Sequence, residues 1–317
     1  DSPLPHISQR NVGEEGECWE KGGKDVSWLS KKRYLIGLLL PTLIIYTVYI
    51  IAPIIMAIGY SFTKYSGIGK ATFNGLTNYK RLLQDDTLWI SFKNTMIIFG
   101  VAFVLLLVGA FFVALLLNNH LKFVDTSKAL IFSPAIIAPI IVGIIWVYIL
   151  DPHVGLINGI LDAIGLPGLK QTWIGGNKLT PYCIGFIYFW QQLGYLTTIY
   201  ITGLRMIPGD VIEAVKIDGA SSWQQLRYVT IPMMKSTIST VAVLLITGIF
   251  KIFEIVQQTT GGGPNHMSET LVTYSYSTTF GNGEYGYGMS LATITFIISL
   301  IIMFVFQFLM RERDKEA

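Results

Sequence analysis

The residues best placed to do chemistry lie in a polar loop between two apolar segments, residues 208–234, which reads PGDVIEAVKIDGASSWQQLRYVTIPMM. Its charged side chains fall at helical spacing on a short amphipathic segment that Pro208 can start and Gly219 can end: Asp210, Glu213, Lys216 and Asp218. Ser221 or Ser222 can cap a second short helix, which we expect to stop before Pro232. The pattern predicts a helix-turn-helix elbow that projects from its surroundings.

A second pair of ionisable residues, Lys251 and Glu254, lies in an otherwise apolar segment. Residues three apart on a helix share a face, so an intrahelical ion pair is one interpretation. The other is that one or both line a polar translocation path, because ionisable groups in a membrane span seldom face lipid. Trp190 and Tyr195 lie beside two glutamines in another segment, where they can stack on a ligand, pack between helices or lie in an interfacial belt.

The elements that must position these residues are membrane spans. The chain has 317 residues, of which 52% are hydrophobic and 14% charged, whereas soluble domains carry about 25% charged residues. We therefore predict an all-α integral membrane protein. Its net charge of +3 is unevenly placed and indicates topology, not nucleic-acid binding. After a polar tail, residues 1–33, uncharged or nearly uncharged stretches predict six spans, at about 34–62, 95–117, 129–150, 182–204, 237–256 and 288–308.

The orientation of these spans follows from the distribution of Lys and Arg. With the amino terminus inside the cell, 15 of the 23 basic residues lie on the inside and seven in external loops, and Lys251 lies within a span. This obeys the positive-inside rule. Six spans return the carboxyl terminus to the cytoplasm, so both termini and the loop at 208–234 are predicted to be cytoplasmic.

The polar loop resembles the cytoplasmic loop of permease subunits in binding-protein-dependent ABC importers, in which Glu-Ala-Ala is followed by Gly six residues after the Glu and then by Ile-x-Leu-Pro. Here Glu213-Ala214-Val215, Gly219 and Val229-Thr230-Ile231-Pro232 occupy those places. The resemblance implies a type I importer fold with a coupling helix that docks in a cleft of the ATP-hydrolysing subunit. The residues it assigns to coupling are Glu213, Ala214, Val215, Asp218, Gly219 and Pro232. An ordinary amphipathic surface helix is the alternative.

A second stretch is similar to the first-subunit type of carbohydrate importers, the maltose and glycerol-phosphate permease type. It comprises Thr260-Gly261-Gly262-Gly263-Pro264, Glu269-Thr270-Leu271 and Tyr274. On composition alone the glycine run indicates a flexible turn, or less often an anion nest. The resemblance implies an extracytoplasmic solute-binding protein, a dimer of ABC ATPase subunits and a second, related permease subunit that forms a heterodimer with this chain in the bacterial inner membrane.

The same resemblance places further residues on a substrate path through the fourth and fifth spans: Leu193, Gly194, Thr197, Gly248, Lys251 and Ile252. Trp190, Tyr195 and Glu254 join this candidate set. The maltose permease subunit has Asn where this chain has Lys251, and a cation there suits an anionic saccharide such as a uronate oligomer. We therefore expect an oligosaccharide as substrate.

No catalytic or metal site is predicted. Gly67-Ile68-Gly69-Lys70 is the nearest approach to a phosphate-binding loop, but the motif's first glycine is Lys64 and Ala71 replaces its Ser or Thr. ATP and Mg²⁺ are therefore expected on separate ATPase subunits. The four His are scattered and no acidic cluster has metal-ligand spacing. Two alternatives stay open: an importer of the same superfamily for another solute, such as amino acids or phosphate, and an ion-coupled secondary transporter in which Lys251 and Glu254 couple the ion.

Overall fold

The computed structural model describes residues 32–118, 124–176 and 178–312, and it divides into two compact units at residues 57 and 58. The predicted tail thus lies outside the described residues, apart from its last two. In the first unit, α2 (Lys32–Tyr46) continues through a π turn, η1 (Thr47–Ile51), into α3 (Ala52–Ser61), and the unit boundary falls within α3. This helical run matches the apolar stretch predicted as the first span.

The second unit begins with small elements ahead of a long helix. Strands β1 (Thr63–Lys64) and β2 (Thr72–Phe73) pair antiparallel, with Thr63 opposite Phe73, and α4 (Thr77–Leu83) follows. Helix α5 (Asp86–Leu117) starts nine residues before the predicted span. Asp85 caps it by accepting a 2.9 Å hydrogen bond from the Thr87 amide, which satisfies one of the free N–H groups of the first turn.

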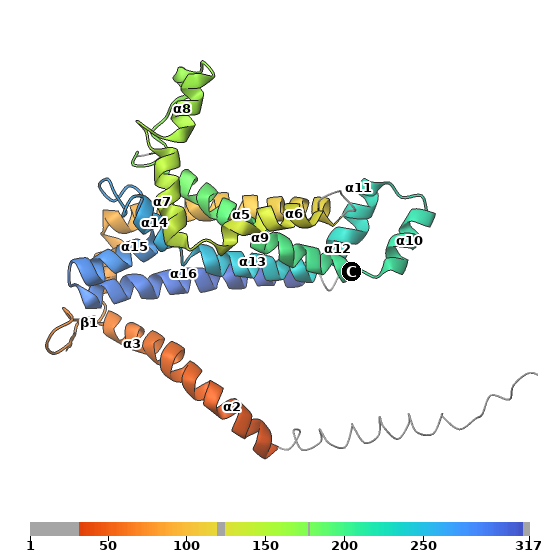
Figure 1. Cartoon of the computed structure of the whole chain (residues 1–317). Helices are drawn as coiled ribbons and strands as arrows, with labels where there is room; N and C mark the ends of the chain where they lie inside the picture. The colour runs from red at the N-terminus through yellow and green to blue at the C-terminus, as the bar shows by residue number, and fades with distance from the viewer. Residues whose placement is uncertain (1–31, 119–123, 177, 313–317) are drawn as a thin grey trace, which may run out of the picture. The chain divides into compact units, whose positions relative to one another are not determined.

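Four long helices lie side by side in this unit (Figure 1): α5, α9 (Thr180–Arg205), α13 (Lys235–Ile249) and α16 (Tyr285–Glu312). α5 packs along α9, and α13 contacts α5, α9 and α16. The buried face of α5 repeats every four residues, at Ile98, Ala102, Leu106 and Ala110. Small residues at half of these positions let the helix backbones approach closely, as membrane helices require.

The third predicted span is divided into two helices that meet at a sharp bend. α6 (Val124–Ile136) and α7 (Pro139–Leu150) are inclined to each other by 99°. Pro139 explains the break, because it lacks an N–H and forces the preceding residue out of the helical region; Ala138 has ψ 136°. α7 ends at Leu150, where the third span was predicted to end.

Beyond α7 the chain forms two short helices, α8 (Leu156–Ala163) and η2 (Pro167–Leu169). Buried Asn158 holds this segment together: its Nδ2 donates to the carbonyls of Pro152 and Gln171 at 3.0 Å, and its Oδ1 accepts from Trp173 Nε1 at 2.8 Å. One amide side chain thus replaces the backbone pairing that this loop lacks.

The remaining elements lie at the two ends of the long helices (Figure 1). α10 (Gly209–Ile217) and the helical run α11 (Ser222–Gln225), η3 (Leu226–Thr230) and α12 (Ile231–Met233) are at one end. At the other end are β1, α14 (Glu254–Thr259), α15 (Leu271–Tyr276) and the π turn η4 (Ser277–Gly281).

Among the described residues, three helices are long and apolar enough to cross a membrane: Leu39–Ser61, Asp86–Leu117 and Tyr285–Met310. Two bent pairs also qualify when each is taken as one span, α6 with α7 and Ser222–Met233 with α13. The sixth predicted span corresponds to α16, and the fourth to α9, whose hydropathy is lower than that of the others.

The close packing of α9 on α6 yields a stability prediction. A Cβ on Gly194 would lie 2.2 Å from the Ile131 carbonyl oxygen and 2.5 Å from the Phe132 Cα, and backbone atoms cannot move aside cheaply. Gly194→Val should therefore destabilise the fold by about 1–3 kcal/mol through overpacking. Thermal unfolding in detergent measures the loss. Gly100→Val on α5, where a Cβ meets nothing within 4 Å, is the matched control, and equal melting of the two variants would contradict the packing argument.

Candidate coupling loop and substrate path

The first half of the coupling loop is a short helix closed by a glycine. α10 begins after Pro208, and Gly219 has a φ of +76°. The Gly219 amide donates to the Lys216 carbonyl at 3.1 Å and the Ala220 amide to the Val215 carbonyl at 3.2 Å, the paired bonds of a Schellman motif. Because this conformation is strained for a residue with a Cβ, the predicted helix end at Gly219 has a definite physical cause.

The second half is fixed by Ser221. Its hydroxyl accepts from the Gln224 amide and the Gln224 side chain accepts from the Ser221 amide at 2.7 Å, which is a capping box. The prediction that this helix stops before Pro232 is wrong, because it continues to Met233. The π turn η3 widens the backbone ring just ahead of Pro232, where an α-helix would place the proline ring against a carbonyl.

The predicted coupling residues lie together on this elbow. Glu213, Ala214, Asp218 and Pro232 are exposed and Val215 is half-buried. Neither carboxylate has an ion-pair partner within the described part of the chain. Beside them Ile217 is 85% exposed and Trp223 63% exposed, so the elbow presents apolar as well as acidic groups outward. Such a surface is suited to docking against another protein.

Lys251 and Glu254 do not lie on one helix, contrary to what the sequence had suggested. The interval 237–256 is not one helix: α13 ends at Ile249 and α14 starts at Glu254, so the two side chains do not share a helix face. Both are exposed, and the structure places no salt bridge between them. The intrahelical ion pair is therefore wrong, and Lys251 lies on a short link between two helices.

Of the other candidate path residues, some are buried in contacts between helices and others are partly accessible. Gly194 packs against α6, and a Cβ on Gly248 would lie 2.5 Å from Tyr188 Oη. Ile252 and Thr197 are buried, and the Thr197 hydroxyl donates to the Leu193 carbonyl at 2.7 Å. The others are at least partly accessible: Leu193 and Trp190 are half-buried, Trp190 lies edge-on to Trp146, and Tyr195 is 43% exposed.

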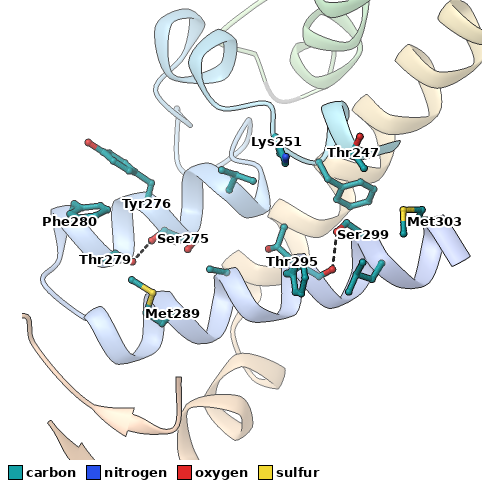
Figure 2. Close-up of a pocket in the computed structure, with 15 residues that line it drawn as sticks. Thr247, Lys251, Ser275, Tyr276, Thr279, Phe280, Met289, Thr295, Ser299 and Met303 are labelled. Carbon is teal, nitrogen blue, oxygen red and sulfur yellow. Dashed lines mark hydrogen bonds between the residues drawn. The ribbon is translucent and has the colours of Figure 1, made fainter. Parts of the chain in front are cut away.

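Lys251 does line a cavity, of about 480 Å³, enclosed by α13, α15, η4 and α16. Figure 2 shows Lys251 on the side opposite Thr295 and Ser299 of α16, with Tyr276 and Phe280 at the other end of the cavity. Most of the lining is apolar or aromatic, with a few hydroxyl groups and one ammonium group. A volume between about 300 and 1,000 Å³ with few convergent polar groups is typical of small-molecule sites.

A polar cluster at the predicted external end was not foreseen from the sequence. Asp85 accepts hydrogen bonds from the hydroxyls of Tyr274 and Tyr287, while Arg81 lies 4.0 Å from the centre of the Tyr287 ring and pairs with Glu284 at 2.6 Å. Burial by itself would raise the pKa of Asp85, but the two tyrosines and the Thr87 and Leu88 amides together lower it. These contacts join α4, α5, α15 and α16.

The loop with the glycine run is also fixed by hydrogen bonds. Asn94 of α5 donates to the carbonyls of Met267 and Glu269, at 2.9 and 3.0 Å. The Glu269 carboxylate, which is buried, pairs with His266 and accepts from Ser277 at 2.9 Å. The glycine run is therefore not simply a flexible turn, because side chains from α5 and η4 fix the segment that follows it, at Met267 and Glu269.

With this geometry established, comparison with known proteins identifies the family. Residues 114–314 match the family described as the binding-protein-dependent transport system inner membrane component, and the chain belongs to it. A protein of Pyrococcus horikoshii named "Probable ABC transporter permease protein" is 33% identical over 249 residues, 78% of this chain and 85% of the relative. The lactose transport system permease protein of Rhizobium radiobacter is 30% identical over 246 residues, 76% of this chain and 81% of the relative.

Solved structures agree on the fold. A bacterial alginate ABC transporter, in complex with an alginate pentasaccharide-bound periplasmic protein, contains a chain that matches with a TM-score of 0.77 at 20% identity, over 90% of this chain and 97% of that one. The chain is thus a membrane-embedded, non-catalytic ABC transporter permease subunit with the type I fold. The predicted family and the all-α fold class are confirmed.

The Asp85 cluster leads to a pH-dependent prediction. Because the folded pKa of Asp85 lies below its unfolded value, near 3.9, the carboxylate stabilises the fold above that pH and loses the effect as pH falls through the lower folded pKa. Asp85→Asn should therefore cost about 1–2 kcal/mol at pH 7 and less near pH 3, which lies below the unfolded pKa. Melting temperatures in detergent at the two pH values measure this. Asp86→Asn, next to it and exposed, is the control, and equal losses for both would contradict the assignment.

Proposed function

We propose that this chain is the permease subunit of an ATP-driven importer that moves an oligosaccharide across the bacterial cytoplasmic membrane. The observation that carries the proposal is the elbow at 208–234. Its Schellman motif at Gly219 and capping box at Ser221 hold a short helix, with Glu213 and Asp218 exposed, at one end of the long helices. A transporter that is not driven by a separate ATPase subunit does not need such a rigid docking element.

The proposed partners follow from this elbow and from the family. An ABC ATPase dimer, which binds ATP and Mg²⁺, receives the coupling helix; a second, related permease subunit completes a heterodimer; and a solute-binding protein delivers substrate from outside. Closure of the ATPase dimer moves the elbow and turns the central cavity outward. Such alternating access needs two states that ligands on both sides bias differently. An ABC permease needs no ion gradient, so the ion-coupled alternative is set aside.

Support for a saccharide comes from the names of relatives and from the cavity. Relatives at 30% identity are named as permease proteins for lactose and, as "probable", for starch degradation products, the latter in Thermoanaerobacterium thermosulfurigenes. A relative in Synechocystis, 29% identical, is named as an uptake permease for osmoprotective compounds. The experiment described below therefore also includes a solute of that class. The Lys251 ammonium group, with no ion-pair or hydrogen-bond partner among the described residues, favours an anionic saccharide of the uronate type.

The test of substrate class uses the complete importer, copurified through a tag on this chain and placed in liposomes with its binding protein. Uptake of maltopentaose, alginate pentasaccharide and glycine betaine is measured with ATP inside. Import of either saccharide supports the proposal, whereas import of glycine betaine alone would overturn it.

The role of Lys251 is tested by charge removal. Lys251→Gln should reduce uptake of alginate pentasaccharide about tenfold and leave maltopentaose uptake within about twofold, because only the anion loses a charge-assisted hydrogen bond. Lys93→Gln, an exposed lysine of α5, is the control. An equal loss for both saccharides would remove the case for charge selectivity and leave the permease assignment unaffected.

The coupling role is tested at Gly219. Gly219→Ala places a Cβ at φ +76°, which costs about 1 kcal/mol or more and displaces the elbow. We expect ATP hydrolysis that is no longer stimulated by saccharide, or loss of the ATPase subunits on purification. Gly209→Ala, at the start of α10 with open space around it, should behave like the wild type. Normal coupling in Gly219→Ala would contradict the proposed role.

A further inference from the structure

A continuous line of aromatic side chains runs from the predicted external surface to the cavity at Lys251. Successive ring centres are separated by 4.8 Å (Phe253 to Tyr276), 5.0 Å (Tyr276 to Phe280), 5.7 Å (Phe280 to Tyr285), 5.8 Å (Tyr285 to Tyr65) and 5.2 Å (Tyr65 to Tyr60). We call these six rings the aromatic track. Four of them belong to four different helical elements, Tyr60 to α3, Tyr276 to α15, Phe280 to η4 and Tyr285 to α16. Tyr65 follows β1 and Phe253 lies on the link between α13 and α14, so the fold and not local sequence brings the rings together.

The middle of the track is open. Phe280 is 60% exposed and Tyr276 46% exposed, and both line the cavity that contains Lys251. The outer rings Tyr60, Tyr65 and Tyr285 are half-buried, as is Phe253 at the inner end. Both rings are therefore accessible to a molecule that enters the cavity.

The hydroxyl groups of the cavity indicate what kind of molecule meets these rings. Each donates its proton to a backbone carbonyl: Thr279 to Ser275 at 2.7 Å, Thr295 to Leu291 at 2.8 Å and Ser299 to Phe296 at 2.8 Å. The free lone pairs of these oxygens can then only accept. The described side chains of the cavity therefore offer aromatic faces, hydrogen-bond acceptors and two donors, the Lys251 ammonium group and the Tyr276 hydroxyl (Figure 2).

A saccharide matches this combination. The two faces of a pyranose ring present C–H groups that stack on aromatic rings, and its edge carries hydroxyl donors that need acceptors. A lipid acyl chain would use the rings but leave the Lys251 ammonium group without a partner, at a cost.

We propose that the aromatic track binds the saccharide chain by stacking as it enters the permease, with Tyr276 and Phe280 as its principal contacts and Lys251 at its inner end. This inference rests on the proposed function and adds a specific subsite to it. It implies that long substrates, which cover several rings, depend on the track more than short ones do.

The experiment uses the reconstituted importer and two probes of one chemistry, maltose and maltopentaose, or their uronate counterparts if only those are imported. Phe280→Leu and Tyr276→Leu keep apolar bulk but remove the ring, and each should raise the KM for the pentasaccharide about fivefold, with a smaller effect on the disaccharide. Phe280→Tyr and Tyr276→Phe keep the ring and should retain wild-type uptake. Phe304→Leu on α16, also 60% exposed but outside the track, is the matched control.

Each result decides between stacking and another role. If the leucine variants assemble and import the pentasaccharide like the wild type, the proposed role of the aromatic track is wrong and the proposed function of the chain is unaffected. Equal losses for both substrate lengths, or failure of the leucine variants to assemble with the second permease subunit, would identify the rings as a packing surface and overturn the inference. If the wild-type complex imports no saccharide, the proposed function fails and the track with it.

Discussion

The contact on which the second unit depends is the packing of α9 against three other helices. Three glycines of α9 are each in close contact with a different helix. A Cβ added to Gly185 would lie 3.0 Å from Val101 of α5, one added to Gly194 would lie 2.2 Å from Ile131 of α6, and one added to Gly203 would lie 2.4 Å from Thr237 of α13. In lipid, helices gain little from burying apolar area against each other, so van der Waals packing of close backbones must hold them together. The glycines make that approach sterically allowed.

This central position also explains the composition of α9. A helix that buries half of its residues within the protein does not need an apolar surface on all sides. On its buried side α9 carries Gln191, whose Nε2 donates to the Ile137 carbonyl at 3.0 Å beside the bend between α6 and α7. The carbonyl freed by that bend thus finds a donor within the protein, as the membrane interior demands. The lower hydropathy of α9 is therefore a consequence of its place in the bundle.

Sequence reasoning succeeded where short-range chemistry decides the structure and failed where distant residues do. The ends set by Gly219 and Ser221 were predictable because each motif is complete within six residues. The bend at Pro139 was available from the sequence but overlooked. The sequence contains no comparable signal for the end of α13, because neither Gly nor Pro directly follows its last residue, Ile249. The aromatic track joins residues as far apart as Tyr65 and Tyr285, and only the tertiary fold places them in contact.

The two functional regions are joined by a single rigid element. α13 begins directly after the coupling loop, at the 67° bend near Met234, and ends two residues before Lys251. Its 15 residues span about 22 Å, and it is held near one end by Gly203 against Thr237 and near the other by Tyr188 against Gly248. A helix fixed in this way transmits displacement with little bending. In the mechanism that we propose, movement of the elbow would therefore be transmitted along α13 to the link that carries Lys251, where the helix ends.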